Sequence, residues 1–292
     1  MTYLEAILLG AVQGIFMFVP VSSTAHLVIT QHLLIRSGSD LPAPDSPEMI
    51  LFDLVVHVGT LVSIAVVFWT SLLQLTVSSI RDADAFFIRR IVGKRMGLSL
   101  RLVLLGLLTV LVTGIVGLIF KASFERVFGA PHLIAFTLAA TGALLWWSDR
   151  LRPRPYGLKD IGWRTATIIG LAQALALIPG LSRSGVTIMA GLFVGLKRRW
   201  AAEYSFLVAI PTILAATLVQ GAEVLGGAGL GGIGIGPLLA AFVVSALVGI
   251  GALHLVLALL YRARLKYFSI YLWALAIVVA FGFLDELLPA YG

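Results

Sequence analysis

Apolar residues fill most of the chain in long runs that short polar clusters interrupt. A bilayer-spanning helix needs about 20 apolar residues, and six runs predict full transmembrane helices at about 49–76, 102–120, 131–147, 201–220, 237–260 and 267–287. Two further apolar stretches, 3–36 and 165–196, are each divided by a polar cluster into halves too short to span. We therefore predict an all-α integral membrane protein with two re-entrant helical hairpins and about six transmembrane helices, forming a single membrane domain over residues 1–292.

The composition agrees with this pattern and excludes several classes of function. Of 292 residues, 60% are hydrophobic and 12% are charged, and the mean hydropathy is +1.03, as in polytopic membrane proteins. The net charge of +7 comes from basic clusters between apolar runs, so it indicates positive-inside topology, and no nucleic-acid partner is expected. The absence of cysteine excludes disulfides, thiol catalysis and zinc–thiolate sites.

Lysine and arginine predict the orientation of the segments. Most of them fall in four clusters, at 77–101, 148–164, 197–199 and 262–266, which we place on the cytoplasmic side. A single crossing by 165–196 would put the third cluster on the opposite side from the second, whereas a hairpin keeps both inside. Both termini and the opening of the first hairpin are then expected outside.

The two polar clusters belong to what reads as an internal repeat. Gln13 lies nine residues before Ser22, and Gln173 lies nine residues before Ser182; in both stretches an apolar run and a proline precede the hydroxyl cluster. With the orientation above, this predicts an inverted repeat of about 1–147 and 165–287. Half-helices that meet near the midplane would then offer backbone N–H groups to an anion, with hydroxyl residues at the N-cap positions, namely Ser22, Ser23, Thr24, Ser182 and Ser184.

Arg183 marks a candidate site within the second cluster. A charged side chain at the centre of a membrane costs about 3 kcal/mol by insertion scales, and a guanidinium there suits the phosphate of a lipid or a transported oxyanion. Ser23 and His26 stand three residues apart, so they share a helix face and form a minimal nucleophile and base pair. Packing against the backbone or the core remains the simpler interpretation of that serine and histidine.

Acidic residues in the apolar spans give two further candidates. Asp53 and His57 are four residues apart on one face of the span at 49–76. Either both line the same cavity as the two polar clusters, or Asp53 lies near the outer headgroups and His57 is packed in the core. Glu203 follows a basic cluster and is interpreted as the interfacial partner of Arg198 or Arg199.

Four stretches, at 19–26, 52–60, 179–187 and 202–207, carry a resemblance to a known family. With the specific pattern Pro-Gly-x-Ser-Arg-Ser-Gly-x-Thr at 179–187, the chain closely resembles the BacA-type undecaprenyl-diphosphate phosphatases. The resemblance implies hydrolysis of a polyprenyl diphosphate lipid to the monophosphate and phosphate, on the outer face of the inner (plasma) membrane. The product is the recycled lipid carrier of cell-wall synthesis, and a divalent cation, Mg²⁺ or Ca²⁺, is usually required.

The resemblance also implies roles for individual residues. Ser23 matches the nucleophile, His26 the essential histidine and Arg183 the diphosphate-binding arginine. The substrate-binding set that we expect contains Gln13, Ser22, Thr24, Asp53, His57, Ser182, Ser184 and Thr187. A homodimer is left open.

Met17 departs from the family pattern, because a glutamate is expected there, four residues after Gln13. A thioether is a poor ligand for Mg²⁺ or Ca²⁺. Either Asp53 supplies the carboxylate and any metal ligand, or hydrolysis is lost while binding is kept, or the residue was changed to trap a substrate complex. The alternative functions are a non-hydrolytic carrier or flippase for polyprenyl phosphate and a lipid-binding scaffold without turnover.

Overall fold

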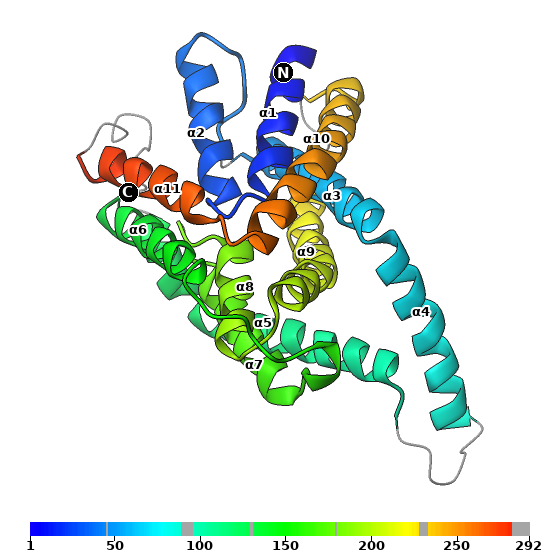
Figure 1. The fold of residues 1–292 in the computed structure, drawn as a ribbon. Helices are drawn as coiled ribbons and strands as arrows, with labels where there is room; N and C mark the ends of the chain where they lie inside the picture. Colours follow the sequence, from blue (N-terminus) through cyan, green and yellow to red (C-terminus); the bar gives the residue numbers. More distant parts are fainter. Residues whose placement is uncertain (45, 89–95, 129–130, 179, 228–232, 282–292) are drawn as a thin grey trace.

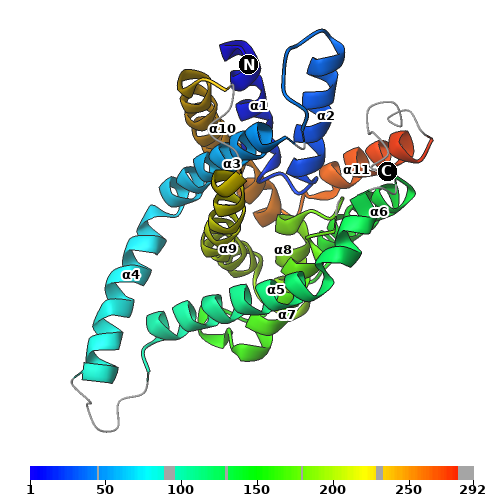
Figure 2. The same ribbon diagram turned by 180° about the vertical axis from the view of Figure 1, so that it is seen from behind.

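The computed structural model describes residues 1–44, 46–88, 96–128, 131–178, 180–227 and 233–281, and this part of the chain is helical without a β-strand (Figures 1 and 2). In chain order the elements are α1 (Tyr3–Phe16), α2 (Ser23–Arg36), α3 (Pro47–Val67), α4 (Trp69–Ala83), η1 (Asp84–Ile88), α5 (Leu98–Phe128), α6 (Pro131–Ser148), η2 (Leu158–Asp160), α7 (Trp163–Leu175), α8 (Arg183–Phe193), α9 (Arg198–Gly227), α10 (Ile235–Tyr261) and α11 (Lys266–Ala280). The predicted all-α membrane fold is confirmed.

Four helices are long and apolar enough to cross a membrane, counted over the described residues: Pro47–Val67, Leu98–Phe120, Arg198–Ala222 and Ile235–Tyr261. The predicted spans at 131–147 and 267–287 correspond to shorter apolar helices, Leu133–Ser148 and Lys266–Ala280, and the residues from 282 onward lie outside the described part.

The predicted span at 49–76 differs from the structure, because it divides at Phe68 into α3 and α4. Beyond this point hydroxyl and amide residues replace the continuous apolar run, so the chain no longer favours an all-round apolar helix. Leu73 and Val77 on α4 are exposed, whereas Ser71 faces the polar residues of α9. Figure 1 shows α4 leaving the bundle and approaching the start of α5.

The first hairpin consists of α1 and α2, whose outer ends lie together. The Ser39 hydroxyl, just after α2, donates a hydrogen bond to Glu5 Oε1 at the start of α1 (2.5 Å). Helix α1 packs closely along α10, because Gly10 brings the two backbones together; a Cβ there would lie 2.6 Å from the carbonyl oxygen of Ala241. This helix pair supports the first hairpin.

The second hairpin consists of α7 and α8 and is closed in the same way. The segment before α7 meets the segment after α8, since Tyr156 donates its N–H to the Gly195 carbonyl (3.0 Å) and accepts from Lys197 N–H (2.9 Å). Helix α7 packs along α5, where a Cβ on Gly170 would lie 2.8 Å from the carbonyl oxygen of Thr109. Both predicted hairpins are therefore present, while the inverted-repeat division at about 147 and 165 stays a prediction.

The basic clusters come together at one end of the molecule. Arg101 donates to the carbonyls of Lys159 (2.7 Å) and Ile161 (2.6 Å), and Lys266 N–H donates to Asp149 Oδ2 (2.8 Å). The basic residues at 89–95 lie outside the described part of the chain. These contacts fit the expectation that the clusters share one side of the membrane.

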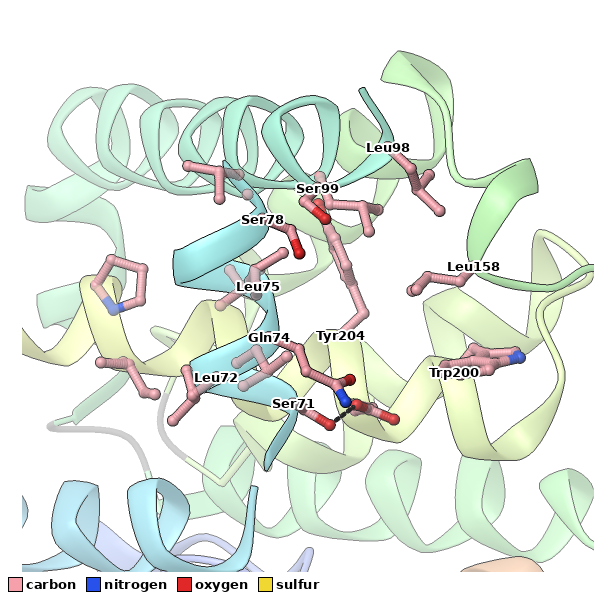
Figure 3. A pocket seen from close by; sticks show the side chains of 18 of the residues that line it. Ser71, Leu72, Gln74, Leu75, Ser78, Leu98, Ser99, Leu158, Trp200 and Tyr204 are labelled. Carbon is pink, nitrogen blue, oxygen red and sulfur yellow. Dashed lines mark hydrogen bonds between the residues drawn. The ribbon is translucent and has the colours of Figure 1, made fainter. Parts of the chain in front are cut away.

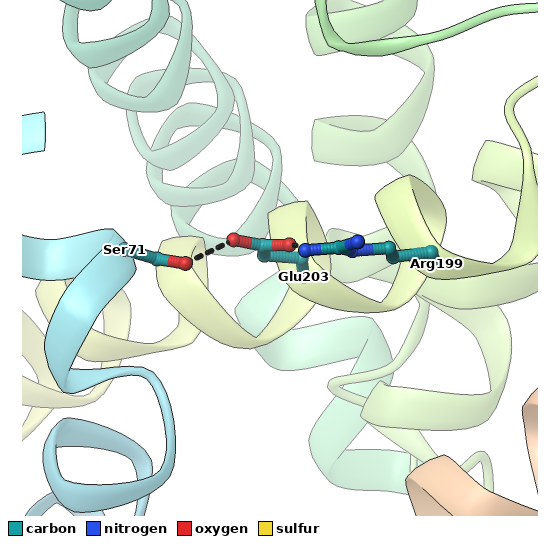
Figure 4. A network of polar contacts seen from close by, with 3 residues as sticks. All are labelled: Ser71, Arg199 and Glu203. Carbon is teal, nitrogen blue, oxygen red and sulfur yellow. Dashed lines mark hydrogen bonds and ion pairs between the residues drawn. The ribbon is translucent and has the colours of Figure 1, made fainter. Parts of the chain in front are cut away.

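A cavity of about 760 Å³ opens between α4, α5 and α9 near this end (Figure 3). Its wall is mostly apolar, with a polar network at one edge: Ser71 donates to Glu203 Oε1 (2.5 Å), and Arg199 Nε lies 3.8 Å from Glu203 Oε2 (Figure 4). The predicted ion pair of Glu203 is thus confirmed with Arg199. The cavity lies apart from the predicted site, because no residue of that site lines it.

Candidate active site

The tips of the two hairpins meet at a second cavity, of about 380 Å³, which α3 and α9 complete. Ser184 Oγ on the second hairpin donates to the Phe18 carbonyl on the first (3.4 Å), which holds the tips together. Predicted site residues that line this cavity are Met17, Ser22, Ser23, Thr24, Asp53, His57, Ser182, Arg183 and Ser184. Segments that are up to about 170 positions apart in the sequence therefore form one polar chamber.

Two helix N-termini face this chamber. Helix α2 begins at Ser23 and α8 begins at Arg183, so the predicted N-cap positions fall on Ser22 and Ser182. Ser182 Oγ accepts from the Gly185 N–H (3.3 Å), but the Ser22 side chain makes no such bond, and its backbone is left-handed (φ 70°). The first N–H groups of α2 thus lack a side-chain cap from the described residues, which suits an anion at the helix terminus.

Arg183 supplies the positive charge of the chamber. Its Nη2 contacts the Met17 sulfur at 3.5 Å, and Gln13 Nε2 approaches the same sulfur at 3.7 Å. A thioether is a weak acceptor, and Arg183 makes no ion pair with any described residue. The guanidinium is therefore available to an anionic ligand.

The two predicted histidines lie differently. His57 lines the chamber, and its Nδ1 donates to the Asp53 carbonyl (2.6 Å). His26 is buried outside the chamber lining; its Nδ1 donates to the Ser22 carbonyl (2.8 Å), and its Nε2 accepts from the Tyr271 hydroxyl (2.5 Å). His26 is thus on the same helix as Ser23 but directed toward α11.

Asp53 contributes the only carboxylate among the described residues that line the chamber. Its Oδ1 accepts from Gln31 Nε2 (3.0 Å). The described residues contain no group of three His, Cys, Asp or Glu side chains able to hold a metal. One carboxylate that is already hydrogen-bonded does not fit a resident Mg²⁺ or Ca²⁺ site, so the cation requirement stays a prediction and no step below depends on it.

Two predicted substrate-binding residues lie behind the chamber. Gln13 is fully buried, and its Oε1 has no partner among the described residues. Thr187 is buried and donates to the Arg183 carbonyl (2.8 Å). Both support residues of the chamber from behind.

Several polar residues at or near the site were not predicted from the sequence: Thr212, Thr217 and Gln220 of α9 in the lining, Gln31 beside Asp53, and Tyr271 on α11. The α9 residues lie on one face of an apolar helix, and polar positions at helical spacing were the available signal. Tyr271 carried none, because its partner is 245 positions away.

Comparisons with known proteins agree on one family. The family model described as bacitracin resistance protein BacA matches residues 6–278. A protein of Alkalilimnicola ehrlichii named undecaprenyl-diphosphatase is 58% identical over 98% of this chain and 98% of its own. A Halorhodospira halophila protein of the same name is 59% identical over 96% and 97%, and one from Alkaliphilus metalliredigens is 36% identical over 97% and 100%.

Proposed function

The chain belongs to the BacA family, and from this premise we propose that it hydrolyses undecaprenyl diphosphate to undecaprenyl phosphate and inorganic phosphate. The observation that carries the proposal is the position of Arg183 at the junction of two helix N-termini, in a chamber that also contains Ser23; Arg183 makes no ion pair with a carboxylate of the described residues. A guanidinium and converging N–H groups are the usual recognition elements for a diphosphate.

Each part of the lipid has a complementary part of the chamber. Arg183 and the first N–H groups of α2 and α8 bind the diphosphate, with hydrogen bonds from the hydroxyl groups of Ser22, Thr24, Ser182 and Ser184. The prenyl chain leaves along the apolar lining, formed by Ile50, Leu54, Leu177, Leu181, Ile213 and Ala216.

Ser23 is the nucleophile in this proposal. It is the first residue of α2, and its side chain belongs to the chamber lining. Its Oγ attacks the terminal phosphorus, the bond from that phosphorus to the bridging oxygen breaks, and undecaprenyl phosphate leaves. Water then hydrolyses the phosphoserine. Arg183 and the N–H groups stabilise the charge on the phosphoryl oxygens during both steps.

The alternative of a non-hydrolytic carrier or flippase is not favoured. Relatives that match nearly the whole chain are named as diphosphatases. Ser23 and Arg183, to which the resemblance assigns the chemistry, are also both present in one chamber.

We propose that the active site lies on the outer side of the inner membrane. Helix α9 begins at Arg198, beside the basic clusters, whereas its chamber residues start at Thr212, about 20 Å further along at 1.5 Å per residue. Because the chain has no cysteine, Asp40→Cys and Lys159→Cys can be labelled singly in intact cells. A membrane-impermeant maleimide should label the first and spare the second; the reverse would contradict the placement. A homodimer stays a prediction.

Phosphate release from undecaprenyl diphosphate by purified protein tests the proposed reaction. We expect Ser23→Ala to lower the rate by about 10³-fold or more, with Ser37→Ala at the other end of α2 as the matched control. Pre-steady-state mixing with lipid labelled at the terminal phosphate should give a labelled protein in the wild type. Full activity of Ser23→Ala would remove Ser23 from the nucleophile role.

A further inference from the structure

His26 and His57 share the same local geometry. Each is on a helix, and each ring donates its Nδ1–H to the carbonyl four residues earlier, at 2.8 Å for Ser22 and 2.6 Å for Asp53. A carbonyl oxygen can only accept, so the proton of each neutral ring is on Nδ1 and the lone pair is on Nε2. The important difference between the two histidines is therefore what Nε2 meets.

The Nε2 lone pair of His26 already accepts a hydrogen bond. The Tyr271 hydroxyl donates to His26 Nε2 at 2.5 Å. The ring also stacks on Phe16, with ring centroids 3.9 Å apart, and only 8% of the residue is exposed. In this position His26 cannot take a proton from Ser23 without breaking its bond to Tyr271.

The lone pair of His57 has no hydrogen-bond partner among the described residues, and the side chain belongs to the chamber lining. The charged groups around it are Asp53, from its own helix α3, and Arg183 from α8. Helices α2 and α9, and the described residues between α7 and α8, contribute only uncharged side chains to the chamber. His57 is thus the one histidine that shares the chamber with Ser23 among the described residues.

We propose that His57 is the general base that accepts the Ser23 proton, and that His26 is a positioning residue whose bond to the Ser22 carbonyl holds the left-handed turn before α2. The proposal rests on the proposed diphosphatase function. It also accounts for Met17, because proton transfer to an imidazole needs no carboxylate at that position.

The reaction balances with His57 alone. As the Ser23 Oγ–P bond forms and the bridging P–O bond breaks, the hydroxyl proton moves to His57 Nε2 and undecaprenyl phosphate leaves. Water then attacks the phosphoserine, its oxygen and both hydrogens leave on dihydrogen phosphate, and Ser23 Oγ recovers its proton from His57. The ring returns to its neutral form for the next cycle.

Two histidine variants provide a matched test. His57→Gln should lower kcat by about 10²- to 10⁴-fold, with KM for the lipid changed less than threefold. His57→Ala should regain activity with added imidazole. His26→Gln and Tyr271→Phe should raise KM more than they lower kcat, and imidazole should not restore His26→Ala.

The outcomes separate this inference from the proposed function. A wild type that binds the lipid but releases no phosphate would overturn the function itself. An active wild type with His57→Gln at more than a third of its kcat, or rescue of His26→Ala in place of His57→Ala, would overturn the role of His57. Imidazole rescue also controls for misfolding, because only a protein with a folded chamber can regain activity with imidazole. A His57→Ala protein that is folded and monodisperse but does not regain activity with imidazole would contradict the proposal.

Discussion

Met17→Glu introduces the carboxylate that the family pattern leads one to expect. The Met17 side chain is 5% exposed, and its sulfur lies 3.5 Å from Arg183 Nη2 and 3.7 Å from Gln13 Nε2. A glutamate of nearly the same length would therefore place its oxygens against two N–H donors. We expect it to form an ion pair with Arg183.

The magnitude follows from the cost of giving up that pair. Unit charges about 4 Å apart attract by about 4 kcal/mol at an effective dielectric constant of about 20, and desolvation of the carboxylate offsets part of this. The net free energy of the ion pair is then roughly 1.4 to 2.8 kcal/mol, and the diphosphate must break this pair in order to bind Arg183. This cost corresponds to a ten- to hundredfold higher KM.

The assay is phosphate release in mixed micelles at varied lipid concentration, with EDTA and with added Mg²⁺. Met17→Gln is the control, because it has the same size without the charge and should stay within a few-fold of the wild type. A kcat/KM for Met17→Glu above that of the wild type, in either condition, would show that the carboxylate is what the site lacks. That result would refute the reasoning that Arg183 must be left without a carboxylate partner.

Two further predictions concern stability, measured as thermal unfolding in detergent. Gly10→Ala should lower the free energy of unfolding by about 1–3 kcal/mol, because its Cβ would lie 2.6 Å from a backbone oxygen of α10; Gly114→Ala, with no atom within 4 Å, should cost nothing, and equal shifts would contradict the close approach. Glu203→Ala should cost about 1–3 kcal/mol, because the Ser71 hydroxyl loses its acceptor. Arg199→Ala should cost less than about 1 kcal/mol, because that side chain is 67% exposed; a larger loss for Arg199→Ala would reverse this ranking.

Sequence patterns predicted the hairpins because the rule behind them is simple. Basic residues flank 165–196 on both sides, and the structure joins those flanks through Tyr156 and Lys197. The two polar clusters predicted where α2 and α8 begin, and Arg183 indicated the chamber between these helix starts. Charge placement and helix capping are local properties, so they can be read without knowing the fold.

Tertiary contacts determine the features that the sequence patterns did not predict. The division at Phe68 was missed because the apolar run around it is continuous over a few residues, while the partners of this region, such as Phe206, lie on α9. The different surroundings of His26 and His57 were missed for the same reason: helical spacing gives the face of each ring, whereas Tyr271, which occupies one of them, comes from the last described helix.

Release of phosphate by the wild type beside Arg183→Ala tests the central claim most directly. Truncating one partner of a buried charge contact costs about 2–5 kcal/mol, so kcat/KM for undecaprenyl diphosphate should fall by roughly 30- to 5,000-fold. Arg164→Ala, which removes a cation that stacks on Trp163 away from the chamber, should leave it unchanged. Equal activity of Arg183→Ala and the wild type, or no release by the wild type, would contradict a diphosphatase that binds its substrate through Arg183.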